Sequence, residues 1–197
     1  MSMTQAHSSR AKRLKAATHV VHDRLDRTVM EAASFRDLEG YGRFVQMQWA
    51  FHREIAVLYG DARLQNLLPG LPGRQRLALI EADLADLGRD RPDNGGARNF
   101  AVNKAVSVPE ALGWLYVAEG SNMGAALLRK DAAKLGLSDT FGARHLAPAA
   151  EGPAAHWRTF TSALDAVQLD EAQEQRVVAG ASAAFAYVSR LAEVHLG

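Results

Sequence analysis

The chain has 197 residues, a formal net charge of +1 and no cysteine. This length is typical of one domain and allows a core large enough to enclose a sizeable ligand. The basic residues form no stripe, so nucleic acid is not expected as a partner, and the lack of cysteine excludes disulfides and thiolate metal sites. We expect residues 1–197 to form a single domain and residues 1–9 to be disordered.

The cellular location follows from segments that the sequence lacks. The first residues, MSMTQAHSSRAKRLK, contain no apolar run of the kind found in a secretory signal. The longest apolar stretch, residues 112–118, is too short to cross a bilayer. We therefore expect a cytoplasmic protein with no membrane partner, and a single domain of this size suggests a monomer.

The first half of the chain has the periodicity of amphipathic helices. Residues 10–30 predict one helix, whose apolar positions are Leu14, Val21, Leu25 and Val29. Ser34 or Asp37 is expected to begin the next, whose apolar stripe is Phe44, Met47, Phe51, Ile55 and Leu58. A short segment, residues 61–68, ends at the Pro/Gly cluster of residues 69–73. Residues 74–87 predict a further helix ending at Gly88, with inward side chains Leu77, Ile80, Leu84 and Leu87.

The second half continues the helical pattern after a polar loop at residues 89–99. Ser107 and Glu110 have the spacing of a capping box, and the helix that they open is expected to run to Leu135, with Gly136 after its end. Residues 141–148 predict a short or irregular segment, and residues 153–166 and 170–196 predict two more helices. With no strand pattern or repeat, the fold expected is all-α with about seven or eight helices.

Common catalytic motifs are absent. The sequence contains no P-loop, GxSxG or HExxH motif, and no Glu-x-x-His pairs of a di-iron bundle. Acidic residues in the fourth predicted helix are interpreted as one exposed face: Glu81, Asp83 and Asp86. Two histidine-containing pairs are expected to anchor a loop and a helix start: Arg144–His145 and His156–Trp157.

The sequence AEGSNMGAA, residues 118–126, occupies the middle of the longest predicted helix. Each glycine costs a helix about 1 kcal/mol relative to alanine. Gly120 and Gly124 are four residues apart, a spacing that favours close approach of another helix. The alternative is a flat ligand against the exposed backbone, with Ser121 and Asn122 supplying polar groups.

His22 and Lys15 are seven residues apart, so they share one helix face with a separation of roughly 10 Å. A histidine that ligates iron and a cation that holds a carboxylate would suit haem. A structural histidine is the commoner outcome for such a position. His19 and His22 are also spaced to hold zinc, but no further ligands with suitable spacing are evident.

Gln48 and His52 share a face of an otherwise apolar helix, because they are four residues apart. Buried polar groups need hydrogen-bond partners. The two side chains are therefore expected either to bond each other, as a structural pair, or to hold ordered water for a functional network.

Five segments occur in an order that resembles one family: LKAATHVVHDRLD (14–26), FVQMQWAFH (44–52), GWLYVAEGSNMGAALL (113–128), FGARHLAP (141–148) and HWRTF (156–160). Together they resemble the bacterial haem oxygenases, especially those that Gram-negative pathogens use for iron acquisition. The resemblance extends from about residue 10 to residue 194, and the central glycine block is its most specific part.

The resemblance implies a single, almost wholly α-helical domain that holds haem between a proximal and a distal helix. Haem would be both substrate and cofactor. With O2 and electrons from an external reductase or ferredoxin-type donor, it would be opened to biliverdin with release of carbon monoxide and ferrous iron. A non-catalytic haem carrier or sensor on the same fold is the alternative.

The resemblance also assigns roles to residues. His22 corresponds to the axial ligand of the haem iron, and Lys15 to a residue that contacts a haem propionate. Tyr116 corresponds to an aromatic residue near the haem edge. Together, Lys15 and Tyr116 resemble the members that produce the α isomer of biliverdin.

On the distal side, the resemblance assigns the kinked helix to the stretch from Gly120 through Ser121 to Gly124. Glycine lets the helix backbone approach haem closely, because no Cβ intervenes. Gln48 and His52 correspond to the polar groups that position water for proton delivery.

Overall fold

The computed structural model describes residues 9–32, 35–93, 99–101 and 105–197. Within these residues the only β contacts are isolated bridges around Ser138, so the predicted all-α class is confirmed. The expected disorder of residues 1–8 falls outside the described residues. Ser9 is described, and its side chain accepts a hydrogen bond from the Lys12 amide, 3.2 Å away.

The described residues form seven α-helices and two short 3-10 helices. The α-helices are α1 (Arg10–Glu31), α2 (Leu38–Gly60), α3 (Ala62–Leu67), α4 (Leu77–Asp86), α5 (Val108–Lys134), α6 (Pro153–Ala166) and α7 (Glu171–Leu196). The 3-10 helices are η1 (Leu71–Arg74) and η2 (Arg144–Leu146).

The helix ends follow most of the expected signals. Asp37 caps α2 by accepting a hydrogen bond from the Gly40 amide at 2.7 Å, whereas Ser34 lies outside the described residues. Gly88 and Gly136 follow α4 and α5 with φ of +60° and +81°, a conformation that glycine adopts without strain. The predicted capping box is wrong, because the Ser107 hydroxyl makes no cap bond and is buried without a partner among the described residues.

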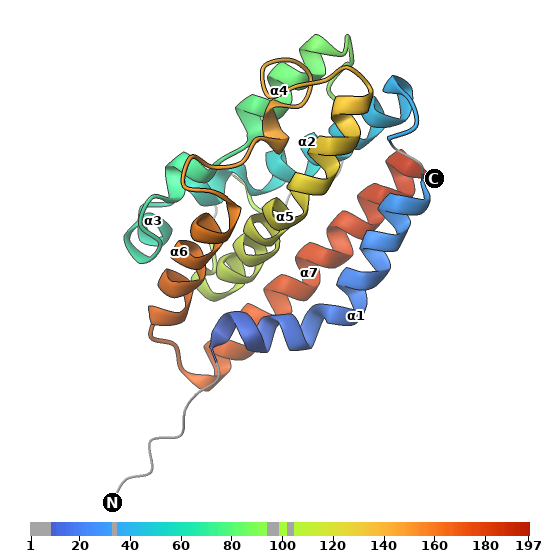
Figure 1. The fold of residues 1–197 in the computed structure, drawn as a ribbon. Helices are drawn as coiled ribbons and strands as arrows, with labels where there is room; N and C mark the ends of the chain where they lie inside the picture. Colours follow the sequence, from blue (N-terminus) through green and yellow to red (C-terminus); the bar gives the residue numbers. More distant parts are fainter. Residues whose placement is uncertain (1–8, 33–34, 94–98, 102–104) are drawn as a thin grey trace, which may run out of the picture.

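Helix α7 is the central element for the arrangement of α1 and α5. It packs against α1, α2 and α5, and in Figure 1 it lies between α1 and α5. Helix α6 packs against α5 and α1. Helix α2 packs against both α4 and α5. The long helices that carry the predicted proximal and distal residues are thus held by one shared neighbour.

A tight crossing between α5 and α7 is made by two glycines that the sequence did not reveal. A Cβ atom on Gly113 would lie 2.2 Å from the Val177 carbonyl oxygen, and one on Gly180 would lie 2.3 Å from the Glu110 oxygen. Both neighbours are backbone atoms, which cannot move aside as a flexible side chain can. The crossing therefore requires glycine on both helices.

Replacing Gly113 with alanine should lower the free energy of unfolding by about 1–3 kcal/mol or more, the usual range for overpacking a tight core. Urea unfolding followed by circular dichroism measures this difference. Gly60→Ala is the matched control, because a Cβ there has no neighbour within 4 Å. Equal stabilities of the two variants would show that the crossing can relax.

Among the described residues, α7 is the one helix whose length and composition would permit a membrane span, with a mean hydropathy of 1.3 over 18 residues. Within that window, 39% is buried inside the protein. The packing of α7 against three other helices accounts for its apolar composition.

Candidate functional site

The glycine block of α5 does not mediate close helix packing. A Cβ on Gly120 would meet only the Trp157 ring, at an ordinary 3.7 Å, and one on Gly124 would meet nothing within 4 Å. The interpretation that spacing alone favoured, close approach of another helix, is therefore wrong at this place. Helix α5 also continues without interruption through the block, so the predicted kink is not accompanied by a break in the helix.

Apolar side chains are exposed on both α1 and α5. On α5, Leu127 is 57% exposed and follows Gly124 by three residues, and Met123 is 44% exposed. On α1, Val20 and Val21 are 66% and 42% exposed. Val21 was predicted to face the core, and its exposure shows that it does not. Exposed apolar side chains mark a binding surface where they form a contiguous patch, and a ligand between α1 and α5 would join these two groups.

His22 lies on this exposed side of α1. Its Nδ1 atom is 3.5 Å from an Asp26 carboxylate oxygen, and its ring meets the edge of Phe185 with centroids 5.7 Å apart. Histidine ligands of metals usually have such a carboxylate near the nitrogen that does not bind the metal, which here would leave Nε2 for it. The zinc alternative gains no support, since the described residues contain no group of three His, Asp or Glu that could hold an ion.

One part of α7, residues 177–185, contacts both His22 of α1 and Gly113 of α5. Phe185, which contacts His22, is one helical turn beyond Ala181, whose amide lies at the Gly113 crossing. Gly113, Gly120 and Gly124 lie on one face of α5, because seven and eleven residues correspond to whole turns. Helix α7 thus contacts α1 at His22 and α5 at Gly113, whereas Gly120 and Gly124 lie two and three turns further along α5.

The contact between α5 and α6 brings together Tyr116, Gly120 and Trp157. The rings of Tyr116 and Trp157 have centroids 5.6 Å apart, and Trp157 is also the neighbour of Gly120. Burial raises the pKa of Tyr116 and keeps its phenol neutral. The Ser121 hydroxyl donates to the Ala118 carbonyl at 2.7 Å, so in this structure it is bonded to its own helix.

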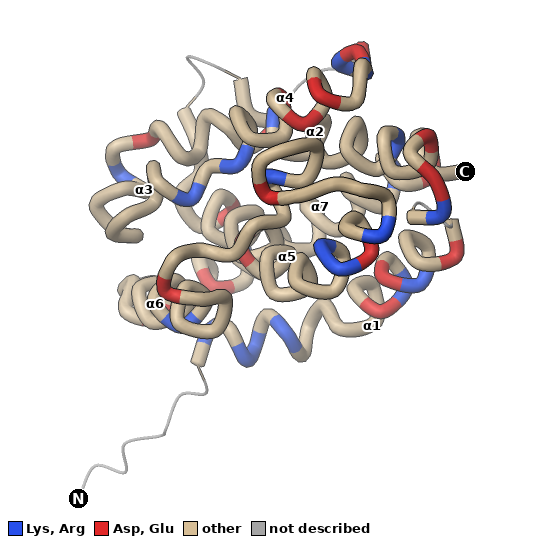
Figure 2. The backbone as a smooth tube through the Cα atoms, turned by 45° about the horizontal axis from the view of Figure 1, so that its top comes forward, with Lys and Arg blue, Asp and Glu red and all other residues tan. Residues whose placement is uncertain are grey.

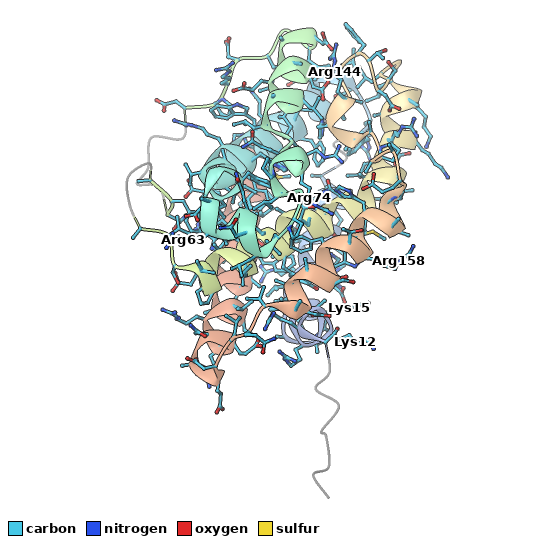
Figure 3. All side chains as sticks on the ribbon, turned by 90° about the vertical axis from the view of Figure 1, so that its left-hand side faces the viewer. Lys12, Lys15, Arg63, Arg74, Arg144 and Arg158 are labelled. Atoms are coloured by element: carbon cyan, nitrogen blue, oxygen red, sulfur yellow. The ribbon has the colours of Figure 1, made fainter. Side chains whose placement is uncertain are left out.

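Lys15 belongs to a basic group at the start of α1. Figure 3 shows Lys12 and Lys15 of α1 near Arg158 of α6, and all three are exposed. No acidic residue occurs between positions 10 and 22, as the blue start of α1 in Figure 2 shows. Arg10 fixes this end of α1 to α6, with its guanidinium donating to the backbone oxygen of Leu164. The result is a rigidly held surface suited to carboxylates.

His52 is buried, and its Nδ1 atom has no hydrogen-bond partner among the described residues. No hydrogen bond joins it to Gln48 within that part of the chain, so the direct structural pair is not observed. Burial lowers the pKa of His52 to about 3, with further lowering by His145 and Arg76. The ring is therefore neutral at physiological pH, and its role in holding water stays a prediction.

The buried His52 predicts a specific loss of stability in acid. The unfolded chain takes up the proton near pH 6.5 but the folded chain only near pH 3, so falling pH favours unfolding across this interval, by at most about 5 kcal/mol. His52→Gln should flatten the dependence of the unfolding free energy on pH between 6.5 and 4, measured by urea titration. His19→Gln, at an exposed position, should leave the slope unchanged. A slope retained in His52→Gln would disprove the assignment.

A buried ionic group next to Gly120 was missed by the sequence reading. Glu119 is 2% exposed and accepts hydrogen bonds from the Tyr59 hydroxyl at 3.1 Å and the Arg74 guanidinium at 2.9 Å. His156 Nε2 lies 3.7 Å from the same carboxylate. An acid directly after the apolar run 112–118 was the available signal, because a buried charge requires partners.

The prediction that the acidic residues of α4 form one exposed face is wrong at Asp83, which is fully buried. Its carboxylate accepts from His145 Nδ1 at 2.7 Å and from the backbone amides of Arg144 and His145 at 3.0 Å. Asp83 follows Ile80 by three residues and so lies on the inward stripe. The prediction that Arg144–His145 anchors a loop is confirmed.

Three comparisons relate the chain to known proteins. The family model described as heme oxygenase matches residues 8–193. The heme oxygenase PigA of Pseudomonas aeruginosa is 42% identical over 177 residues, which cover 89% of this chain and 87% of that protein.

Two solved structures share the fold of this chain. The crystal structure of the NO- and CO-bound heme oxygenase from Neisseria meningitidis aligns with a TM-score of 0.86 and 38% identity, covering 96% of this chain and 92% of the other. The heme oxygenase of Leptospira interrogans, at 17% identity, shares the fold with a TM-score of 0.73 over 95% of this chain and all of that one. The extent of the family match and the identity to the Pseudomonas protein show that this chain belongs to the haem oxygenase family.

Proposed function

We propose that residues 1–197 act as one haem oxygenase domain that binds haem between α1 and α5 and cleaves it, with O2 and electrons, to biliverdin, carbon monoxide and ferrous iron. The observation that carries this proposal is the open glycine face of α5: a Cβ on Gly124 would have no neighbour within 4 Å. Since nothing in the described part of the chain packs against Gly124, and Gly120 meets only the Trp157 ring, the glycines are best explained by close approach of a flat substrate.

The side chains around this face fit haem. His22 offers Nε2 to iron while Asp26 lies beside Nδ1, and the exposed Val21 and Leu127 suit the apolar porphyrin. Lys15, with Arg158 nearby, would hold a propionate. Haem supplies the iron that activates O2, whereas the protein orients the porphyrin and excludes water from its faces.

The distal residues would control where the reaction occurs. Without side chains at Gly120 and Gly124, the backbone confines the space above the porphyrin. Gln48 and the neutral His52 would position water that delivers protons, which avoids a strong acid beside the iron. Tyr116 beside Trp157 and Lys15 on α1 would fix the rotation of haem, and we assign the α-meso carbon as the position cleaved.

Electrons would come from an external reductase or ferredoxin-type donor in the cytoplasm. The exposed cations Lys12, Lys15 and Arg158 give that end of the molecule a positive surface, which suits an acidic protein donor. The Neisseria relative is described with NO and CO bound, which supports binding of diatomic ligands such as O2 by this chain as well.

The decisive experiment is aerobic turnover of the haem complex with an artificial reductant, followed by separation of the biliverdin isomers. We expect loss of the Soret band and formation of the α isomer. An intact porphyrin after prolonged reduction would instead identify a haem carrier or sensor. A different isomer would retain the enzyme assignment and overturn the roles given to Lys15 and Tyr116.

A further inference from the structure

One buried guanidinium joins α5 and α6 beside the glycine block. Arg74, the last residue of η1, donates through Nη1 to the Glu119 carboxylate of α5 at 2.9 Å. Through Nη2 it donates to the backbone oxygen of His156 of α6 at 3.1 Å. Its Cζ atom also lies over the Phe160 ring, 5.7 Å from the centroid. The guanidinium thus uses its planar fork for two partners and its face for a third.

Each partner of this guanidinium is directly linked to the residues around the glycine face. Glu119 immediately precedes Gly120, and His156 immediately precedes Trp157. Phe160 stacks on the Trp157 ring, with centroids 5.8 Å apart. Among the described residues, the Trp157 ring is the one neighbour that a Cβ on Gly120 would meet. The guanidinium therefore sets the spacing between Gly120 and Trp157.

Trp157 and Tyr116 form one side of the space over the glycines. The centroids of their rings are 5.6 Å apart. Tyr116, Gly120 and Gly124 follow one another at intervals of four residues, so they lie along one face of α5. A flat ligand on the glycines would therefore have this ring pair at its edge.

The Glu119 carboxylate is held from several sides. It also accepts a hydrogen bond from the Tyr59 hydroxyl at 3.1 Å, and His156 Nε2 lies 3.7 Å away. Burial and this carboxylate raise the pKa of Tyr59, so the phenol keeps the proton that it donates. A buried ion pair seldom stabilises a fold more than apolar side chains of similar size would. The place of the pair next to Gly120 therefore favours a role in position over a role in stability.

We propose that Arg74 and Glu119 are positioning residues that hold Trp157 against Gly120, so that the ring pair of Tyr116 and Trp157 limits the rotation of haem. Both act through Trp157, since their own side chains are buried in contacts within the protein. This inference rests on the proposed function, because it names residues that orient the substrate of that same site.

The first test uses the ligand-free protein with 5-fluorotryptophan in place of its three tryptophans. Trp157→Phe identifies the 19F signal of Trp157. Arg74→Lys keeps the charge, but an ammonium cannot serve the Glu119 carboxylate and the His156 oxygen as a planar fork does. It should shift and broaden the Trp157 signal and leave the other two unchanged. An unchanged Trp157 signal would overturn the proposal.

Arg63→Lys is the matched control. Arg63 also donates to a carboxylate, that of Asp61 at 2.7 Å, and to a backbone oxygen, that of Val106 at 3.2 Å. It lies on α3, however, and its side chain is 55% exposed. This variant should leave all three signals unchanged. An equal shift of the Trp157 signal would show that the probe does not report on Arg74 and would contradict the proposal.

Glu119→Gln provides the same test if Arg74→Lys does not fold. An amide has one acceptor oxygen, whereas Tyr59 and Arg74 donate to the two oxygens of the carboxylate. The Trp157 signal should shift in this variant too, and its constancy would overturn the proposal equally.

The second test measures how haem is seated and needs no turnover. The haem methyl resonances of the ferric cyanide complex report the rotation of haem about the axis through its iron. We expect one dominant seating in the unmodified protein and in Arg63→Lys. In Arg74→Lys a second seating should appear, together with a mixture of biliverdin isomers on turnover.

Two other outcomes are distinguishable. The same single seating in Arg74→Lys, despite a shifted Trp157 signal, would restrict Arg74 to a structural role and refute its positioning role. Haem binding without degradation by the unmodified protein would refute the proposed function, while the methyl resonances would still decide whether Arg74 orients haem.

Discussion

His22→Ala should abolish haem degradation. Loss of a partner that merely orients a metal ligand typically costs about 10–100-fold, and loss of the ligand itself should exceed this. The side chain is half exposed on α1 and touches the core only at the edge of Phe185, so the variant should fold. The ferric and ferrous–CO spectra of the haem complex should lose the features of an axial imidazole, and added imidazole should restore them in part.

His19→Ala is the control within the same helix. His19 is exposed one turn earlier, and its Nδ1 lies 2.9 Å from the Ala16 carbonyl oxygen of its own helix. Its removal should change neither the spectra nor the rate. If His19→Ala abolished the axial signature and His22→Ala did not, α1 would carry the ligand at a different position and the alignment of this segment with the family would be incorrect.

Much of the fold could be predicted from local patterns in the sequence. Asp37, Gly88 and Gly136 mark helix ends because capping depends on residues only a few positions apart. The Gly113–Gly180 crossing could not be found in this way, since it joins residues 67 positions apart and either glycine alone has no distinctive context. The ion pair of Arg74 and Glu119 could not be predicted for the same reason, since the two residues are 45 positions apart.

The candidate site was predictable only in part. Spacing on one helix face pointed to His22 and Lys15, and the family resemblance added Tyr116. Spacing alone favoured helix packing for Gly120 and Gly124. Periodicity placed Val21 in the core, because it records that a residue is apolar but not whether a neighbour covers it. A substrate surface and a core surface have the same composition, and coordinates are needed to separate them.

Gly124→Leu should have opposite effects on stability and activity. A side chain at this position meets nothing within 4 Å, and leucine favours helix over glycine, so the free energy of unfolding of the ligand-free protein should rise by about 0.5–1 kcal/mol. The same side chain would fill the space that the porphyrin needs. Haem turnover should therefore fall by at least about tenfold, with partial retention of haem affinity.

Ala133→Leu is the matched control for Gly124→Leu, because Ala133 is exposed on another face of α5. It should change neither property. Unfolding in urea and turnover of the haem complex, measured on the same preparations, separate the two effects. Turnover at the normal rate in Gly124→Leu would remove the case for backbone approach to haem, whereas a loss of stability would mean that another part of the protein occupies this face. Only a stabilised, inactive variant shows that glycine is kept here for the substrate rather than for the fold.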